Sequence, residues 1–453
     1  MFWKLVLTLF LTGALAVVQN EPLPSLRMQQ RIQSEWVHTR TNDIIPSLLT
    51  QHKVDMWILS MREYNEDPVF WGLVTRATTF AARRRTVFVF SNKGGEFRQW
   101  RFIDNTDQVW ADLVKVLYEV DPLTIAVDID ASGNNFADGL HTGESERLLK
   151  SLPWAYWIRI QRVPLLATQF LATRPEGMLD MYKRIMGTAH AIIREGISGS
   201  VITPGTTTTE DLQWWFRDRI QSLNMTTWFH PSVDVQRFDP ISGKVITFVN
   251  EDVTIEKGDL IWTDFGVTFM GLNTDTQHNG YILRDGETEA PEGLRNGLTR
   301  HSNLMQDILM REINTNLTGN EVLKIARAEM TALNINGTIY CHPIGDYGHA
   351  AGSLIGMTNL QDGVPVLGDI PIFPHMWFSI ELQANVPVPE WNAQQVNFRQ
   401  EEDMYLDADG VPRWVVGRQS ELHLVGAAGQ IEQHVQVQEA GKQVGAAQIL
   451  FQE

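Results

Sequence analysis

The sequence predicts an α/β domain followed by a larger α+β domain that has two lobes. The α/β domain is indicated by short apolar runs such as VDMWILSM and TVFVFSN, whose β-branched and aromatic residues are typical of buried strands. Helical stretches alternate with such runs through about residue 173. The α+β domain is indicated by a coarse repeat, in which two helix pairs are each followed by strand-like runs. With 453 residues, 43% of them hydrophobic, the chain can bury cores of this size.

The first domain is predicted to span residues 17–173. Its opening stretch, residues 25–52, has a helical pattern, and the later runs LTIAVDID and WIRIQRV resemble the first two strands. The pattern changes at Pro175, so we place the second domain at residues 174–426. The tail at residues 427–453 is rich in Gln, Ala and Val and has no predicted role.

The repeat in the second domain is seen in its helices. GMLDMYKRIMGTAHAIIREGI and TTTTEDLQWWFRDRI form the first pair, and LRNGLTRHSNLMQDILMREI and EVLKIARAEMTAL form the second. Thr318 and Glu321 have the spacing of a capping box, which marks the start of the last of these helices. Two such halves predict a domain with a cleft between them.

The charge and cysteine content exclude several classes of protein. The chain has 37 Lys and Arg against 54 Asp and Glu, so its formal net charge of -17 repels the phosphate backbone and we expect no nucleic-acid partner. Cys341 is the single cysteine, which excludes an intrachain disulfide and a thiolate metal site. Any metal ion must therefore be bound by His, Asp and Glu.

The amino terminus has the pattern of a secretory signal. A basic start, MFWK, precedes the apolar run LVLTLFLTGALAVV and the polar QNEPLPS. Residues 1–16 are the expected signal peptide, with cleavage after Ala14-Leu15-Ala16, so we expect a secreted or periplasmic protein. A membrane anchor is the alternative, but the run is shorter than the roughly 20 residues of a membrane-spanning helix. We therefore expect no stable membrane anchor.

Two aspartates give the first sign of chemistry. GDLIWTDFGVTFMGLNTDTQHNGYIL places Asp264 and Asp275 in what we interpret as a hairpin that closes near Phe269 and Met270, so that the two face each other. Opposed carboxylates, with Cβ atoms about 5 Å apart, repel unless one is protonated or a cation lies between them. Phe-Met is a poor primed turn, which suggests a bulge or a longer loop. Two ordinary polar residues on an exposed hairpin face are the alternative.

Two histidines follow in IYCHPIGDYGHAAG. His342 and His349 are seven residues apart among glycines and alanines, which allow the backbone to approach a ligand closely. Considered alone, each histidine could instead be structural.

Two glutamates complete the set. In WFSIELQANVPV the alternation places Glu381 on the face opposite Phe378 and Ile380, as a carboxylate in an otherwise well-packed strand. In QVNFRQEEDMYLDADGV, Glu401 shares a face with Arg399, a cation that could hold it ionised.

Asp, Asp, His, Glu and Glu in this order are what two hard divalent ions need. With these motifs the sequence resembles the pita-bread (M24) metallopeptidases: methionine aminopeptidase, aminopeptidase P, prolidase and their relative creatinase. DFGVTFMGLNTD has the spacing of the family's aspartates, HPIG and His349 match its histidines, and SIEL matches its first glutamate. Glu401 lies nine residues before Gly410, as the last ligand does. The resemblance covers residues 175–425, and it implies a pita-bread α+β domain after a creatinase-type domain at residues 25–173.

The resemblance also implies roles. Asp264 would chelate one ion, Asp275 and Glu401 would bridge both, and His342 with Glu381 would complete the other. Glu381 would take a proton from the attacking water and return it. Mn²⁺ is the expected ion because the ligands are rich in oxygen, and Co²⁺ or Zn²⁺ could replace it.

Two further histidines would contact the substrate. His349 would steady the scissile carbonyl oxygen, and His230 in TTWFHPSVDV stands where the family has a histidine that contacts substrate or shuttles protons. His230 lies 34 residues before Asp264, about twice the family's gap, because RFDPISGKVITFVNED near residues 237–252 resembles an inserted hairpin. A structural role for His230 stays open.

The specificity signature is incomplete. Prolidases and aminopeptidases P have another histidine where this chain has Thr338, whereas their substrate-binding arginine is present as Arg399. Together with the signal pattern, the resemblance implies an exported dinuclear peptidase that hydrolyses the bond next to an amino-terminal residue or in a dipeptide, with an Xaa-Pro bond as the first choice, in a family that often forms homodimers. The alternatives are a metal-free pita-bread module that binds peptides and a creatinase-like C–N hydrolase.

Overall fold

The computed structural model describes residues 23–426. The predicted signal peptide, its cleavage site and the tail at residues 427–453 lie outside the described residues. Within residues 23–426, every helix is too short or too polar to cross a membrane.

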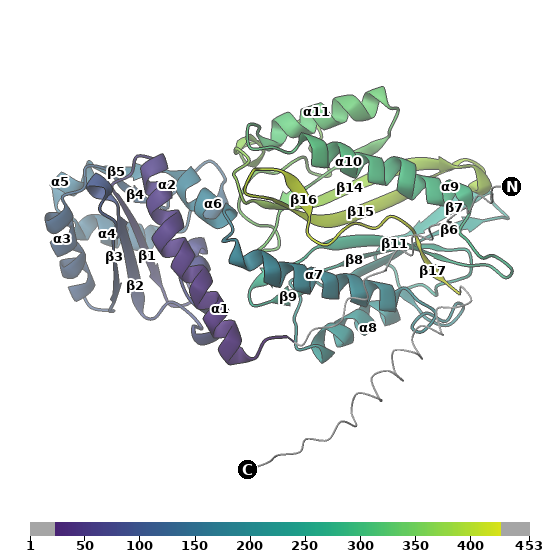
Figure 1. The fold of residues 1–453 in the computed structure, drawn as a ribbon, viewed down its shortest axis with the longest axis horizontal. Coiled ribbons are helices and arrows are strands. Elements are labelled where there is room, and N and C mark those ends of the chain that lie inside the picture. Colours follow the sequence, from purple (N-terminus) through teal and green to yellow (C-terminus); the bar gives the residue numbers. More distant parts are fainter. Residues whose placement is uncertain (1–22, 427–453) are drawn as a thin grey trace, which may run out of the picture.

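The amino-terminal part contains a five-stranded sheet with helices on both faces (Figure 1). The strand order is β3-β2-β1-β4-β5, in which β1, β2 and β3 pair antiparallel and β4 and β5 continue in parallel. The strands are β1 (Met56–Arg62), β2 (Arg85–Ser91), β3 (Arg98–Ile103), β4 (Ile125–Val127) and β5 (Ile160–Arg162). The predicted α/β architecture of this part is confirmed.

Strand β1 is buried on both of its faces, which explains its continuous apolar sequence. Trp57 and Leu59 pack with helices α2 and α6, whereas Met56 and Ile58 pack with α3 and α4. The first helix, α1 (Leu26–Thr39), continues through a π-helical turn, η1 (Arg40–Ile44). The other helices are α2 (Ile45–Gln51), α3 (Gln108–Val120), α4 (Thr142–Ser151), α5 (Trp154–Trp157) and α6 (Pro164–Ala172).

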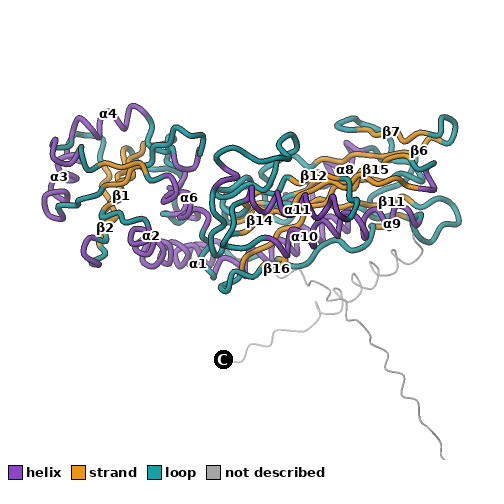
Figure 2. Tube along the Cα trace, turned by 90° about the horizontal axis from the view of Figure 1, so that it is seen from above, coloured by secondary structure: helices purple, strands orange, loops and turns teal. Residues whose placement is uncertain are grey.

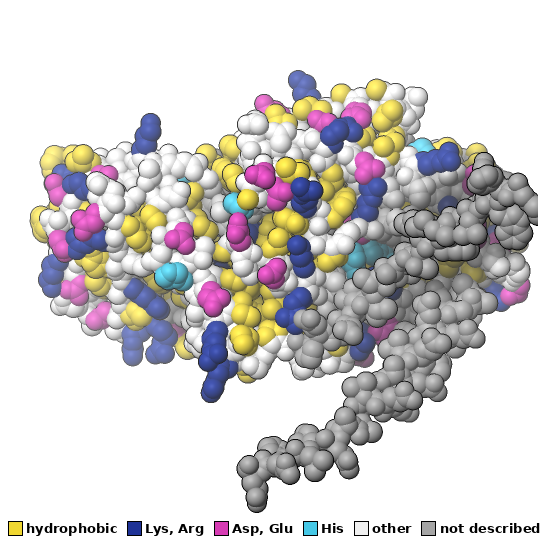
Figure 3. Space-filling view, viewed as in Figure 1, with side chains coloured by type: hydrophobic (Ala, Val, Ile, Leu, Met, Phe, Trp, Pro, Cys, Tyr) yellow, Lys and Arg dark blue, Asp and Glu magenta, His cyan; other side chains and the backbone are white. Residues whose placement is uncertain are grey.

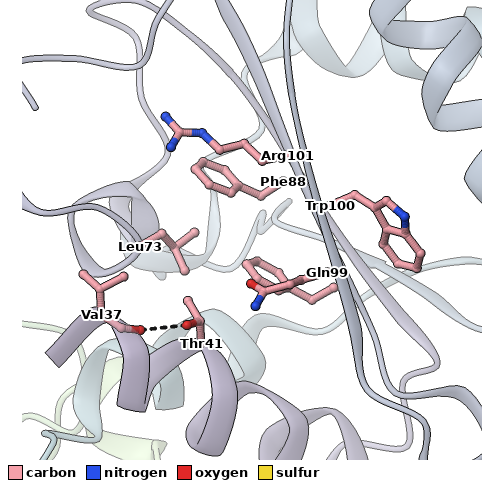
Figure 4. A pocket seen from close by; sticks show the side chains of 8 residues that line it. Val37, Thr41, Leu73, Phe88, Gln99, Trp100 and Arg101 are labelled. Atoms are coloured by element: carbon pink, nitrogen blue, oxygen red, sulfur yellow. Dashed lines mark hydrogen bonds between the residues drawn. The ribbon is translucent and has the colours of Figure 1, made fainter. Parts of the chain in front are cut away.

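A cavity of about 280 Å³ lies between α1 and strands β2 and β3 (Figure 4). At its edge, the Thr41 hydroxyl donates to the Val37 carbonyl oxygen at 2.8 Å. The cavity is lined by Val37, Thr41, Leu73, Phe88, Phe90, Gln99, Trp100 and Arg101. None of these residues belongs to the predicted metal ligands.

The carboxy-terminal part contains a ten-stranded sheet, with the main order β12-β14-β15-β11-β8-β6-β7 (Figures 1 and 2). Strands β13, β16 and β17 pair beside β14, β15 and β11. The long strands are β6 (Ser232–Asp239), β7 (Lys244–Phe248), β8 (Leu260–Phe265), β11 (Thr276–Ile282), β14 (Trp377–Val388) and β15 (Gln394–Leu406). The short ones are β12 (Gly337–Ile339), β13 (His342–Pro343), β16 (Pro412–Trp414) and β17 (His423–Val425).

Two groups of helices cover this sheet, as the repeat predicted. α7 (Gly177–Gly196) and α8 (Thr209–Ser222) pack with β6 and β8 in one core, and α10 (Asn303–Glu312) and α11 (Gly319–Ala332) pack with β14 in another. α9 (Glu292–Asn296) leads into α10 through a π-helical turn, η6 (Gly297–Ser302). The predicted capping box of Thr318 and Glu321 begins α11. The predicted α+β architecture is therefore confirmed.

The hairpin that carries the two aspartates differs from the prediction. Asp264 in β8 lies opposite Gln277 in β11, not opposite Asp275. A small extra hairpin, β9 (Thr268–Phe269) with β10 (Leu272–Asn273), is inserted between these strands, and it turns at Met270 and Gly271 with φ of 55° and 83°. The predicted bulge or longer loop is correct, but the direct opposition of the two aspartates is wrong because this insertion shifts the register.

The predicted hairpin near residues 237–252 is confirmed. Strands β6 and β7 pair antiparallel, and Asp239 lies opposite Lys244 at the closed end. Asp239 accepts hydrogen bonds from the backbone N–H groups of Ile241 and Ser242, which stabilise the turn.

Charged side chains of both signs are scattered over the face of the molecule shown in Figure 3. Acidic groups therefore do not gather into one patch on that face, even though the whole chain carries a net charge of -17.

Candidate active site

Neighbouring strands bring the five predicted ligands to one face of the sheet. Glu381 in β14 lies directly opposite Glu401 in β15. Gln277 in β11 lies opposite both Glu401 and Asp264, so Asp275, two residues before it, shares that face. His342 begins β13, which pairs with β14. Residues from four distant segments thus converge because their strands are neighbours in the sheet.

Three of the ligands form a compact group. One atom from each of Asp275, His342 and Glu401 lies within 4.8 Å of the others. His342 Nε2 lies 3.6 Å from Asp275 Oδ2 and 3.4 Å from Glu401 Oε1. Its Nδ1 lies 3.0 Å from the Pro343 carbonyl oxygen, to which Nδ1–H donates. This hydrogen bond leaves the Nε2 lone pair available for a metal ion.

The electrostatics of the group favour the binding of a cation. Burial, and next the charge of Glu401, raises the pKa of Asp264, Asp275 and Glu381 well above the ordinary range. Burial alone would lower the pKa of His342, but the Glu401 carboxylate beside it raises the pKa to about 9. Three atoms, Asp264 Oδ1, Asp275 Oδ1 and His342 Nε2, are buried without a hydrogen-bond partner among the described residues. Divalent ions would neutralise these charges and fill these positions, so the residues fit a metal centre.

Gln277 lies inside this centre and was not predicted. Its Nε2 donates to Glu381 Oε1 and to Glu401 Oε2, the latter at 2.8 Å. Its Oε1 accepts a hydrogen bond from Trp262 Nε1 at 3.1 Å. The signal was present in the sequence, because Gln277 follows Asp275 by two residues and strand alternation puts both on one face.

Asp403 and Tyr182 support Asp275 from behind. Asp403 Oδ2 accepts hydrogen bonds from the backbone N–H of Asp275 at 3.1 Å and from the Tyr182 hydroxyl at 2.7 Å. The Tyr182 ring stacks on Trp377 with 4.3 Å between ring centroids. Asp403 lies on the face of Glu401, two residues further along the same strand, but its role as a support could not be foreseen because Tyr182 comes from α7.

Glu402 is the neighbour of Glu401 and points to the opposite face. Its Oε1 lies 2.7 Å from His278 Nε2 and its Oε2 lies 2.8 Å from His190 Nε2. The backbone N–H of Gln419 also donates to Oε1, at 2.7 Å. Burial would raise the pKa of Glu402, but the charges of His190 and His278 outweigh it and lower the pKa to about 2.

Arg399 was predicted to lie beside Glu401 and to hold it ionised. The structure instead pairs Arg399 Nη1 with Asp234 Oδ2 at 2.8 Å. The guanidinium also lies 3.6 Å from the Trp262 ring centroid. Arg399 is thus paired with Asp234 of β6, a strand whose position in the sheet the sequence does not reveal, and its effect on the ionisation of Glu401 stays a prediction. The substrate-binding role of Arg399 stays a prediction.

The two predicted substrate histidines differ in their surroundings. The His349 ring lies 4.6 Å from the ring centroid of His342 and 5.2 Å from that of Trp228. Loss of water around the imidazole, and next the charge of His342, lowers the pKa of His349. Both histidines are exposed, but His230 contacts Trp214 and Arg217 of α8 rather than the predicted ligands. His349 is thus placed beside the centre, whereas the catalytic role of His230 stays a prediction.

Tyr340 also lies beside the centre and was not predicted. Its backbone N–H donates to the Glu381 carbonyl oxygen at 3.1 Å. Burial, and next the charge of Glu381, raises the pKa of Tyr340 well above the ordinary range, so the phenol keeps its proton at neutral pH. Its position two residues before His342 was the only signal in the sequence. Thr338, two residues further back, lies opposite Gln383 in β14.

Three solved structures share this architecture. The X-Pro aminopeptidase of Thermotoga maritima matches with a TM-score of 0.57 and 16% identity, over 84% of this chain and 100% of that one. The Xaa-Pro dipeptidase of Bacillus anthracis matches with a TM-score of 0.56 and 15% identity, over 86% and 99%. A dipeptidase of Pyrococcus horikoshii matches with a TM-score of 0.54 and 16% identity, over 87% and 99%. At such identities the likeness shows the fold alone, and it confirms the predicted pita-bread fold.

A family match covers the candidate site itself. No curated protein matches the chain significantly. The profile of Metallopeptidase family M24, however, matches residues 181–439, which is more than half of the chain. This range includes all five predicted ligands, from Asp264 to Glu401. The chain therefore belongs to metallopeptidase family M24.

Proposed function

We propose that this metallopeptidase uses two divalent ions, most readily Mn²⁺, to hydrolyse the bond next to the amino-terminal residue of a short peptide. The observation that carries the proposal is a buried set of carboxylates with one histidine. Atoms of Asp264, Asp275 and His342 lack hydrogen-bond partners among the described residues, and the pKa values of the carboxyl groups of Asp264, Asp275 and Glu381 are raised. The three structural neighbours described as X-Pro aminopeptidase, Xaa-Pro dipeptidase and dipeptidase support a peptide substrate of this kind.

Asp264, Asp275, His342, Glu381 and Glu401 would hold the ions. Bound divalent ions polarise a carbonyl group and lower the pKa of water to near neutrality. Glu381 then accepts the proton of the attacking water and returns it to the leaving amine. Gln277 keeps one Glu381 oxygen in a fixed position through its amide N–H. Because this hydrogen bond already fixes the Glu381 side chain, less conformational entropy is lost in the reaction.

His349 is placed to assist at the carbonyl group. Its lowered pKa keeps the imidazole neutral at neutral pH, so one ring N–H can donate to the scissile carbonyl oxygen. Tyr340 keeps its hydroxyl proton because its pKa is raised, and it offers a second donor near Glu381. Both donors are uncharged, so neither adds to the charge of the bound ions.

The specificity is proposed to be Xaa-Pro, with slow or broadened cleavage. Thr338 is shorter than histidine and uncharged, so one contact around a proline ring is missing. Arg399 already has Asp234 as its partner, which leaves less of its charge to bind a peptide carboxylate. Both features favour tolerance of residues other than proline after the scissile bond.

A peptide-library digest of the full chain, read by mass spectrometry, tests the proposal. The protein is first treated with a chelator and then supplied with Mn²⁺, Co²⁺ or Zn²⁺. Release of single amino-terminal residues should disappear on chelation and return with metal. Glu381→Gln should lose most activity because an amide cannot accept the proton, whereas Glu421→Gln, at an exposed position, should not. Full activity of metal-free protein, or of Glu381→Gln, would contradict the proposal.

We also propose that the chain is exported and cleaved near Val17, on the strength of the signal pattern in residues 1–16. Amino-terminal sequencing of the protein from its native host should find Val17 or a close neighbour. Met1 on a membrane-bound protein would contradict the cleavage and leave the catalytic proposal intact.

A further inference from the structure

Three arginines meet one aspartate where the amino-terminal part contacts the loop that carries His342 and His349. Arg40 lies in η1, Arg76 begins the short helix η3 (Arg76–Thr78), and Arg174 lies between α6 and α7. Arg40 Nη2 pairs with Asp346 Oδ2 in the loop. Burial would raise the pKa of Asp346, but the charges of the three arginines outweigh it and lower the pKa. All three guanidinium groups are thus close enough to act on one carboxylate.

The guanidinium groups are buried and incompletely hydrogen bonded. Arg40 and Arg174 are each only 3% exposed. Arg174 Nη2 donates to the Ile344 carbonyl oxygen at 2.8 Å, but its Nε and Nη1 have no partner among the described residues. Arg40 Nε and Arg76 Nη2 are also buried without a partner there. Because each of these atoms carries a hydrogen, the cluster presents unused donors.

The charges of the cluster do not balance. Three guanidinium groups against one carboxylate leave an excess of two positive charges. Tyr347 is the other titratable group that faces Arg76, but burial raises its pKa to about 12, and its hydroxyl donates to the Pro68 carbonyl oxygen. The rings of Trp71 and Trp377 lie against Arg76 and Arg174, at 5.0 and 5.7 Å. Aromatic rings stabilise the flat faces of a guanidinium group and leave its N–H edges free.

We propose that this cluster binds a small monovalent anion of the size of chloride. An anion would accept hydrogen bonds from the free N–H edges and would offset part of the excess charge. The burial of Arg40 and Arg174 favours a small anion over a large hydrated one. This site is separate from the metal centre, because its donors are guanidinium groups and none of them is a metal ligand.

The position of the cluster gives the anion a structural consequence. Asp346 lies between His342 and His349, and Arg174 holds the carbonyl oxygen of Ile344 in the same loop. On its other side, Asn273 Nδ2 donates to the Gly345 carbonyl oxygen at 2.9 Å. A bound anion would reduce the repulsion among the arginines that hold one side of this loop. The anion should therefore stabilise the contact between the amino-terminal part and the histidine loop.

Thermal unfolding of the full chain in chloride tests the site. Sodium chloride replaces sodium gluconate at constant ionic strength, so general screening does not change. The wild-type Tm should rise by about 2–4 °C and saturate. The rise should vanish in Arg174→Gln and persist in Arg98→Gln, which removes a surface arginine paired with Glu119. No saturable rise in wild type, or an equal rise in both variants, would overturn the proposal.

Two further measurements test whether the anion binds to the metal ions instead, and keep the proposal testable if the Arg174→Gln variant does not fold. The rise in Tm should be the same with metal-loaded and with chelated protein, because the site is separate from the metal centre. A rise that disappears on chelation would place the anion on the metal and overturn the proposal. Crystals soaked in bromide should give an anomalous peak beside Arg40 and Arg174. Bromide peaks confined to other positions would also overturn it.

Discussion

Glu401 and Glu402 are neighbours in β15, yet their side chains enter opposite surroundings. Glu401 faces other carboxylates, three of which have raised pKa values because of burial and of the charge of Glu401. Glu402 faces His190 and His278, which lower its pKa to about 2. On the first face Asp264, Asp275 and His342 each have an atom without a partner, whereas no Glu402 oxygen among the described atoms lacks one.

The difference shows which groups balance the carboxylate charge on each face of the strand. On the face of Glu402, the protein supplies its own donors, and a metal ion would have to displace three hydrogen bonds. On the face of Glu401, Ser379 and Gln277 donate to Glu401, but one atom each of Asp264, Asp275 and His342 is left without a partner among the described residues. Although His190, His278 and Glu402 lie close enough to resemble a metal site, their satisfied hydrogen bonds identify them as a structural network.

The largest effect is expected for Glu401→Gln. Loss of a charged ligand should weaken metal binding and reduce peptide hydrolysis by roughly a thousandfold or more, since metal ions contribute several kcal/mol to such reactions. The stability of the metal-free variant should stay close to that of metal-free wild type, because it loses the Glu401 charge that repels the other carboxylates and also the one that pairs with His342. Activity assays with added Mn²⁺ and calorimetry of the chelated protein measure both effects. A variant that is active but less stable would show that Glu401 has the structural role and is not a metal ligand.

The next effect is expected for Gln277→Met. The substitution keeps the length of the side chain and removes the N–H groups that hold Glu381 and Glu401. Metal affinity should fall by about 10–100-fold, as for other residues that orient metal ligands. Titration calorimetry with Mn²⁺ measures the change. Unchanged affinity would show that the sheet alone positions the two glutamates.

Glu402→Gln should affect stability and spare metal binding. An amide offers one acceptor where the carboxylate serves two histidines, so one of His190 and His278 loses its partner. The free energy of unfolding should fall by about 1–3 kcal/mol, the cost of a buried group left unsatisfied. Denaturant unfolding of wild type and variant gives this number. A variant with normal stability and lost metal would mean that the second face binds an ion.

The smallest effect is a change of stability with pH, and it concerns the same glutamate. A carboxyl group with a lowered pKa adds stability above its ordinary pKa of 4.5, and that contribution is lost as the pH falls toward about 2. The difference in unfolding free energy between wild type and Glu402→Gln should therefore shrink below about pH 4.5. Denaturant unfolding at several pH values from 7 to 3 measures it. Parallel stability curves would contradict the ionised state of Glu402.

Local patterns were enough to predict much of the fold and the site. Strand alternation put Glu401 and its neighbour Glu402 on opposite faces of one strand, and their different hydrogen-bond partners confirm it. The capping box at Thr318 and the hairpin near residues 237–252 needed only neighbouring residues, and both are present.

Features that depend on distant strands could not be predicted. The register of Asp264 depends on the small β9–β10 hairpin, where Gly266 has no room for a side chain because a Cβ would lie 2.3 Å from the Thr274 carbonyl oxygen. The partner of Arg399 comes from β6, and one partner of Glu402 comes from α7. Such contacts follow from the order of strands and helices in space, which single-sequence patterns do not contain.

The metal content of the purified protein tests the central claim most directly. Wild type, Glu401→Gln and Glu402→Gln are chelated, reloaded with Mn²⁺, separated from free metal and measured by mass spectrometry. We expect about two ions per chain in wild type and in Glu402→Gln, and less than one in Glu401→Gln. Two ions retained by Glu401→Gln, or ions lost only from Glu402→Gln, would contradict the account of the two faces.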